Sequence, residues 1–194
     1  MPSPSGSDSP LSSSPPGTGG FLHPERTMGR LGIRPGMIVA DFGAGTGYFS
    51  LPAARLVGES GKVYAIDVQK QAVDLVRSKA NLEHLQNVET VWADLERPSG
   101  SHLPDASVDL VIVANILFQA DAKAEVLAEA RRIAKSGGRL AVLEWDQTPF
   151  PAGPPAAMCI SKPLARRLAE EAGFQLEKEF EAGTHHYGLL FVKK

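Results

Sequence analysis

The stretch Val39-Ala40-Asp41-Phe42-Gly43-Ala44-Gly45-Thr46-Gly47-Tyr48-Phe49-Ser50 places three glycines at alternate positions directly after an apolar run. The apolar run, residues 37–42, predicts a buried strand, and the residues that follow Tyr48 can form a helix. Glycines between a strand and a helix let a ligand approach the backbone closely, and they accept positive φ angles. The stretch therefore predicts a strand, a tight loop and a helix start that together cradle a nucleotide-like ligand.

The spacing of the glycines argues against two common phosphate-binding loops. The dinucleotide pattern G-x-G-x-x-G requires glycine at position 48, which is Tyr48, and the P-loop requires a Gly-Lys-Ser/Thr that the sequence lacks. Acidic residues stand beside the expected strand ends instead: Asp41 precedes the first glycine by two residues, and Asp67 ends the next apolar run. A carboxylate at the position of Asp67 can accept both hydroxyls of a ribose. The pattern favours a ribose-containing ligand.

Apolar runs and helix-like segments alternate along the rest of the chain, which is typical of a parallel sheet covered by helices on both faces. Residues 108–114 are apolar apart from Asp109, as in a strand buried on both sides. A loop is expected over residues 148–158, which contain four prolines. Strands are expected at residues 37–42, 62–68, 88–92, 108–114, 139–144, 174–181 and 187–193. Helices are expected at residues 21–28, after residue 69, at 122–135 and after residue 161. The helix after the glycines should start late, around Phe49, because the missing N–H of Pro52 is harmless only near a helix start.

Taken in order, these motifs resemble those of class I S-adenosylmethionine-dependent methyltransferases. The resemblance rests on the glycine stretch, Asp67, the motif Val91-Trp92-Ala93-Asp94, and residues 108–115 and 136–142. It extends to the short bacterial and archaeal type 11 members, a group that includes quinone-ring and metalloid methyltransferases. It implies an α/β fold, a Rossmann-like doubly wound sheet of seven strands in the order 3-2-1-4-5-7-6 with strand 7 antiparallel.

The resemblance also implies the cofactor S-adenosyl-L-methionine and the residues that would bind it. Asp41 would hold the methionine ammonium through water, Asp67 the ribose hydroxyls and Asp94 the adenine amine. Leu95 would pack on the adenine face, and Asn115 would contact the methionine end or the methyl path. The expected cofactor-binding residues are Asp41, Gly43, Ala44, Gly45, Gly47, Asp67, Val68, Asp94, Leu95 and Asn115.

The sequence does not single out a catalytic residue. Methyl transfer is an in-line displacement at a carbon that the sulfonium already activates, so positioning and exclusion of water are the main requirements. The candidates on the expected carboxyl-end loops are Asn115, Gln119, Glu144, Asp146, His185, His186 and Tyr187. Either histidine could act as a base near neutral pH. No metal site is expected, because neighbouring histidines point to opposite sides of a strand.

The length of 194 residues and the composition indicate a chain that consists of one domain and a tail. Residues 1–20 contain seven Ser, five Pro and four Gly and are expected to be disordered, and residues 21–194 are expected to form a single methyltransferase domain. The net charge of -2 argues against a nucleic-acid partner. The compact size, with no appended recognition domain, leads us to expect a small-molecule methyl acceptor. The chain has one cysteine, Cys159, and no membrane span or signal peptide is recognised, which favours a cytoplasmic location.

Two other functions remain open from the sequence. A nicotinamide-dependent oxidoreductase, using NAD or NADP, could have the same architecture, although Tyr48 in place of glycine disfavours it. A non-catalytic module that only binds S-adenosylmethionine would keep the same acids. The metalloid branch is disfavoured because the chain lacks the several cysteines expected of such enzymes. The acceptor, the atom that is methylated and the oligomeric state cannot be inferred from the sequence.

Overall fold

The structure is a computed structural model that describes residues 24–151 and 153–194; the predicted tail, residues 1–20, lies outside this part of the chain. The helices are α1 (Pro24–Leu31), α2 (Ser50–Val57), α3 (Lys70–Leu82), α4 (Lys123–Ile133) and α5 (Lys162–Glu171). The strands are β1 (Ile38–Phe42), β2 (Lys62–Asp67), β3 (Val88–Trp92), β4 (Val108–Ala114), β5 (Ala134–Trp145), β6 (Phe174–Gly183) and β7 (His186–Lys193).

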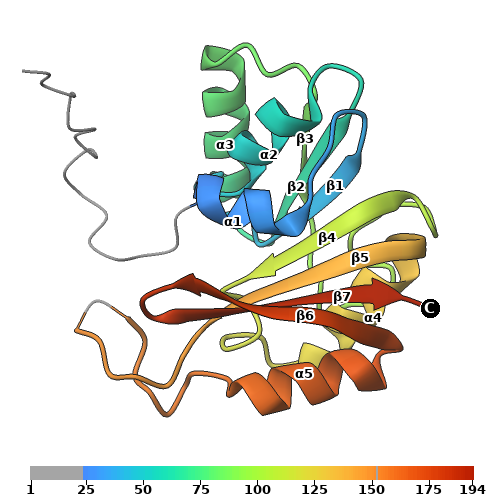
Figure 1. The fold of residues 1–194 in the computed structure, drawn as a ribbon. Coiled ribbons are helices and arrows are strands. Elements are labelled where there is room, and N and C mark those ends of the chain that lie inside the picture. Colours follow the sequence, from blue (N-terminus) through green and yellow to red (C-terminus); the bar gives the residue numbers. More distant parts are fainter. Residues whose placement is uncertain (1–23, 152) are drawn as a thin grey trace, which may run out of the picture.

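The strands form one sheet in the order β3-β2-β1-β4-β5-β7-β6. The pairs among β1 to β5 are parallel, whereas β7 is antiparallel to both β5 and β6. Helices α1, α2 and α3 cover one face of this sheet, and α4 and α5 cover the other (Figure 1). The predicted Rossmann-like fold, its strand order and the reversed seventh strand are confirmed.

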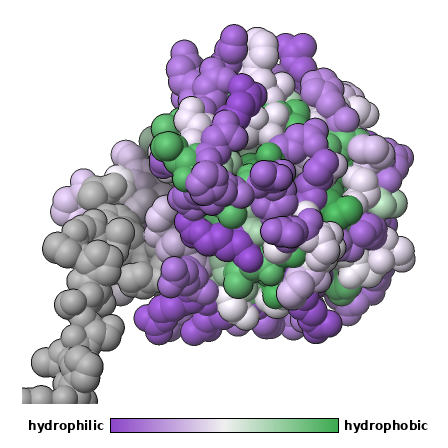
Figure 2. All heavy atoms as spheres, turned by 90° about the horizontal axis from the view of Figure 1, so that it is seen from above, coloured by the Kyte–Doolittle hydropathy of each residue, from purple (hydrophilic) through white to green (hydrophobic). Residues whose placement is uncertain are grey.

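The core has two layers because the side chains of each strand alternate between the faces of the sheet. In β4, Leu110 and Ile112 pack with α1 and α2, whereas Val111 and Val113 pack with α4 and α5. All four are fully buried. The outer surface seen from above is mostly hydrophilic, with small separate apolar patches (Figure 2). Across the described residues, no helix has the length and apolar character that a membrane crossing requires.

The glycine loop between β1 and α2 has the predicted conformation. Gly43, Gly45 and Gly47 have φ angles of 69°, 52° and 83°, values that residues with a Cβ rarely adopt. The backbone N–H groups of Gly43 and Ala44 both donate to the carbonyl of Ile66, at 2.8 and 2.9 Å, which ties the loop to the end of β2. The carboxyl ends of β1 and β2 therefore meet at the loop.

The predicted boundary between α4 and β5 was wrong. We expected a helix over residues 122–135 that stops at Gly137 and Gly138, followed by a strand that begins at residue 139. Instead α4 ends at Ile133 and β5 begins at Ala134. The reason is tertiary: the carbonyls of Arg132 and Ile133 accept hydrogen bonds from the N–H groups of Ala106 and Ser107, at 3.0 and 2.7 Å. The loop before β4 thus satisfies the helix end, and no glycine cap is needed.

The remaining differences are smaller. The first helix was expected over residues 21–28; residues 21–23 lie outside the described part, and α1 extends to Leu31. The β6–β7 connection was expected to span residues 182–186. In the structure β6 continues to Gly183 and β7 begins at His186, so that the connection consists of Thr184 and His185 alone.

Candidate functional site

A pocket of about 320 Å³ opens at the carboxyl ends of β1 to β4, beside the glycine loop. We call it the glycine-loop pocket. Such crevices at the carboxyl edge are where ligands bind in open α/β sheets. The residues that line it are Gly43, Gly45, Asp67, Val68, Gln69, Ala93, Asp94, Leu95, Glu96, Ile116, Gln119, Ala120 and Val126.

Asp67, at the end of β2, is held rigidly at this pocket. Its Oδ2 accepts a hydrogen bond from the Gly45 N–H at 2.9 Å, and its Oδ1 accepts one from the Gln69 N–H at 2.8 Å. An ionised carboxylate has about four acceptor positions, so these two bonds leave room for two more donors. The carboxylate is therefore oriented by the loop and still able to accept hydroxyl groups from a ligand.

Asp94 and Leu95 follow β3 on another side of the same pocket. The Asp94 Oδ1 accepts a hydrogen bond from the Glu96 N–H at 3.0 Å, and Oδ2 pairs with the Arg97 guanidinium at 2.9 Å. The hydrogen bond from Arg97, and to a smaller extent that from the Glu96 N–H, holds the pKa of Asp94 below its ordinary value. The side chain is therefore an acceptor at neutral pH. Leu95 is buried in the core that packs against α4 and presents an apolar surface to the pocket.

Four of the expected cofactor-binding residues do not line the pocket. Ala44 packs under the loop with Leu51 and Val76, and a Cβ on Gly47 would meet the same two side chains. In the structure, Ala44 and Gly47 pack the loop against α2 and α3. Asn115 has a φ of 57°, and its Oδ1 is buried without a hydrogen-bond partner among the described residues. Asp41 is the fourth, and its contact with a cofactor stays a prediction.

Asp41 lies below the glycine loop with 1% of its surface exposed. Its Oδ2 accepts a hydrogen bond from the Ser50 hydroxyl at the start of α2. Burial, opposed by the Ser50 bond and assisted by the nearby charge of Asp67, raises the pKa of Asp41 to about 7. Asp41 thus joins the end of β1 to α2, and its charge changes near neutral pH.

The substitution Asp41→Asn is expected to reduce the pH dependence of stability. Between its ordinary pKa of 3.8 and its folded pKa of about 7, the folded state holds a proton that the unfolded state has released. The free energy of unfolding of the natural chain therefore falls as pH rises through that window, by an amount on the order of 2 to 4 kcal/mol. Asparagine keeps an acceptor for Ser50 and does not titrate. Urea denaturation at about pH 4 and about pH 7.5 measures the change. If the free energy of unfolding changed equally between these two pH values in both proteins, the buried environment assigned to Asp41 would be wrong.

Sequence reasoning missed several lining residues, of which Ile116 is the most informative. A Cβ on Gly43 would lie 2.5 Å from the Ile116 Cδ1, so this side chain rests directly on the first glycine of the loop. Glu96 was also missed; it accepts a hydrogen bond from the Ala122 N–H and ties the pocket to the start of α4. The position of Ile116 directly after β4 was an available signal, because the end of β4 had been expected to open into the ligand crevice.

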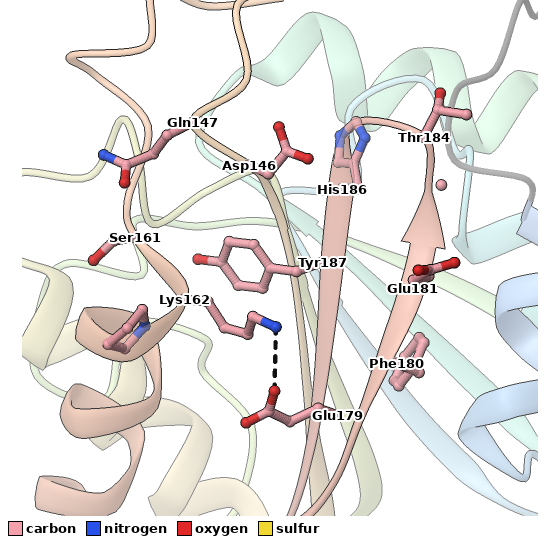
Figure 3. A pocket seen from close by; sticks show the side chains of 12 residues that line it. Asp146, Gln147, Ser161, Lys162, Glu179, Phe180, Glu181, Thr184, His186 and Tyr187 are labelled. Atoms are coloured by element: carbon pink, nitrogen blue, oxygen red, sulfur yellow. Dashed lines mark hydrogen bonds and ion pairs between the residues drawn. The ribbon is translucent and has the colours of Figure 1, made fainter.

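A second pocket, of about 760 Å³, lies between the β6–β7 hairpin and the start of α5 (Figure 3). We call it the hairpin pocket. Three of the candidate residues line it, namely Asp146, His186 and Tyr187. Lys162 and Glu179 face each other across it as an ion pair at 3.2 Å (Figure 3). The Tyr187 hydroxyl donates to the carbonyl of Ile160 at 2.8 Å, which fixes the chain before α5 against β7.

Aromatic rings join the β5–α5 loop to the hairpin. The ring of Trp145 lies 4.0 Å from that of His186, and the ring of Phe150 stacks on His185 at 4.3 Å. His186 is buried, and neither of its ring nitrogens has a partner within the described chain. Burial lowers the pKa of His186 to about 4, so the imidazole is neutral and a weak base at pH 7. Among residues 24–151 and 153–194, no group of three or more His, Cys, Asp or Glu is arranged to hold a metal ion.

Known proteins share the fold of this chain. A profile of the methyltransferase domain matches residues 33–185. The crystal structure of an S-adenosylmethionine-dependent methyltransferase from Aquifex aeolicus superimposes with a TM-score of 0.82 at 31% identity, over 89% of this chain and 90% of that one. An arsenic(III) S-adenosylmethionine methyltransferase from Chlamydomonas reinhardtii has a TM-score of 0.67 at 25% identity, over 84% of this chain and 65% of that one.

Among curated proteins, the ubiquinone/menaquinone biosynthesis C-methyltransferase UbiE of Haemophilus ducreyi is 36% identical over 122 residues, which is 61% of this chain and 45% of that protein. The chain spans about half the length of the curated relatives it matches. The fold and the glycine-loop pocket define a Rossmann-like methyltransferase of class I. The chain belongs to the S-adenosylmethionine-dependent methyltransferases, of the type 11 kind, and its cofactor is S-adenosyl-L-methionine.

Proposed function

We propose that this chain transfers the methyl group of S-adenosylmethionine to a small-molecule acceptor. The observation that carries the proposal is the Asp67 carboxylate, which two backbone N–H groups hold at the mouth of the glycine-loop pocket. The chain's residues fit an adenosine there: Asp67 would accept from the ribose, Asp94 from the adenine amine, and Leu95 would cover the adenine face. Bound S-adenosylmethionine supplies a methyl group on a sulfonium, which is activated without help from a strong base.

The acceptor would bind where the carboxyl ends of β4 and β5 meet the start of β7. Of the described residues, four have buried side-chain N or O atoms without a hydrogen-bond partner: Asn115, Glu144, His185 and His186. All four lie at the ends of β4 and β5 or at the start of β7. Buried polar atoms in native proteins are almost always satisfied, so such a cluster indicates groups that a polar ligand or water would pair with.

A planar ring with oxygen substituents is the acceptor class that we would test first. The rings of Trp145 and Phe150 pack on each other and on the two histidines, so this cluster has an aromatic wall, which suits an aromatic ligand. The curated relatives named above act, by their names, in ubiquinone and menaquinone biosynthesis. An arsenic acceptor has less support, because the chain contains a single cysteine. The protein's part in the reaction is to align the acceptor with the methyl group and to exclude water.

The test is an activity screen that detects S-adenosylhomocysteine, with hydroquinones, amines, phenols and arsenite as acceptors. We expect product with a hydroquinone and none without acceptor. Calorimetry with S-adenosylmethionine and with NADH separates the alternative functions. Binding of NADH alone would favour an oxidoreductase. Binding of S-adenosylmethionine with no turnover on any acceptor would favour a module that only binds the cofactor.

A further inference from the structure

Glu144, on β5, is a buried acid that binds the segment after β4. It is fully buried, and its Oε1 accepts hydrogen bonds from the N–H groups of Ile116 at 2.9 Å and Leu117 at 2.6 Å. These two N–H groups follow Asn115, whose φ of 57° turns the chain out of the strand. The Oε1 atom can accept these two hydrogen bonds whether the carboxyl group is protonated or ionised. Glu144 therefore determines where this segment lies.

This segment is also a wall of the glycine-loop pocket. The Ile116 side chain lines that pocket and rests on Gly43, the first glycine of the loop. The Glu144 carboxyl group is hydrogen-bonded to the backbone of the same residue, so it lies directly behind the pocket wall. On its other side Glu144 pairs with Tyr187 across β5 and β7, and Tyr187 lines the hairpin pocket. Glu144 thus lies between the two pockets.

The second oxygen of Glu144 has no assigned contact. Its Oε2 is buried and makes no hydrogen bond within the described residues, which is costly for a charged group. Three titratable groups interact electrostatically with Glu144: Lys123 at the start of α4, Cys159 before α5 and Tyr187 on β7. Asp146, two residues further along the chain, also acts on Cys159. Burial raises the pKa of Glu144 to about 8, against the lowering effect of the backbone N–H bonds. The group therefore changes charge just above neutral pH.

We propose that Glu144 is a positioning residue that holds the wall of the cofactor pocket, and that its negative charge favours the cationic cofactor over the neutral product. The proposal rests on the proposed function, because it concerns the methyl donor of that reaction. S-adenosylmethionine carries a sulfonium, whereas S-adenosylhomocysteine carries an uncharged thioether. A carboxylate behind the wall attracts the first through a medium of low dielectric constant and loses that attraction when the methyl group leaves. Product release is thereby favoured.

The test compares the affinities of S-adenosylmethionine and S-adenosylhomocysteine, measured by calorimetry from about pH 6 to about pH 9. In the natural chain we expect the ratio of the two affinities, donor over product, to rise by about threefold to tenfold across this range. In Glu144→Gln the ratio should stay constant, because glutamine keeps an acceptor for the N–H groups and cannot ionise. Any titration of the ligands' own groups is the same for both proteins, so it cancels when the pH dependence of the ratio in the natural chain is compared with that in Glu144→Gln.

Two further variants make the result specific. Asp41→Asn removes the other acid near the glycine loop whose pKa lies close to neutral, and it should retain the rise. Glu129→Gln removes a buried carboxylate that instead bonds Ser101 and Arg132, and it should also retain the rise. A constant ratio in the natural chain, a rise that persists in Glu144→Gln, or a rise that only Asp41→Asn abolishes would each overturn the proposal. If the natural chain binds neither ligand, the proposed function itself fails.

Discussion

Replacing Asp67 with alanine is expected to weaken the binding of S-adenosylmethionine by about 2 to 4 kcal/mol, which is roughly 30-fold to 1,000-fold in the dissociation constant. On the proposed assignment of Asp67 to the ribose, the substitution would remove up to two charge-assisted hydrogen bonds. It also releases the N–H groups of Gly45 and Gln69, which the carboxylate orients at 2.9 and 2.8 Å. Both effects act on the same side of the glycine-loop pocket, so they weaken binding together.

Calorimetric titration with S-adenosylmethionine measures this loss. Asp74→Ala is the matched control, because Asp74 is an exposed acid on α3 that pairs with Arg77 outside the pocket. Its affinity should equal that of the natural chain. The affinity of Asp67→Asn should lie between that of Asp67→Ala and that of the control, since the amide retains one acceptor oxygen and loses the charge. An affinity for Asp67→Ala that matches the control would show that the ribose assignment is wrong.

Replacing Gly100 with alanine is expected to lower the free energy of unfolding by about 3 kcal/mol, at the upper end of overpacking effects. A Cβ at this position would lie 2.0 Å from the carbonyl oxygen of Asp94 and 2.8 Å from that of Arg97. Both are backbone atoms, so no side chain can rotate to make room. Because Asp94 must move, we also expect weaker binding of S-adenosylmethionine, through the displaced acceptor for the adenine amine.

Urea denaturation and calorimetry of the same variant measure the two effects. Gly29→Ala is the matched control: a Cβ on this glycine of α1 would meet nothing within 4 Å. Alanine is the better helix former, so this variant should gain about 0.5 to 1 kcal/mol in stability and keep its affinity. A Gly100→Ala protein as stable as the natural chain would contradict the close packing of the Asp94 turn.

The two buried acids, Asp41 and Glu144, cost stability at neutral and alkaline pH. Burial is the largest influence on each, and it raises the pKa to about 7 and about 8. Perturbed acids of this kind cluster at functional sites, where charge is kept in spite of the cost of burying it. Asp41 lies under the glycine loop and Glu144 behind the opposite wall of the pocket. Their placement around one pocket is the common feature that links the pH prediction to the proposed role of Glu144.

Much of this fold followed from local sequence patterns. The bounds of β3 and β4 were predicted to the residue, because turn-forming residues lie on both sides of each strand. The late start of α2 followed from Pro52, whose missing N–H is harmless only in the first turn of a helix. The position of Asp67 in the pocket followed from a rule of geometry, since an acid at the carboxyl end of a parallel strand faces the ligand crevice. The position of Asp94 followed from the resemblance to class I methyltransferases.

Only the tertiary structure decided which side chains face the pocket. Ala44 and Gly47 stand in the glycine motif, yet they turn toward α2 and α3, whereas Ile116 reaches back over the loop. Glu144 binds N–H groups 27 and 28 residues before it, and the end of α4 is satisfied by a loop far from it in sequence. The sequence alone determined which segments form strands and which acids stand at their ends, because periodicity and turn chemistry act over a few residues. The order of the strands in the sheet came from the resemblance to class I methyltransferases. The orientation of each side chain depends on contacts between distant segments, which only the packed sheet and helices create.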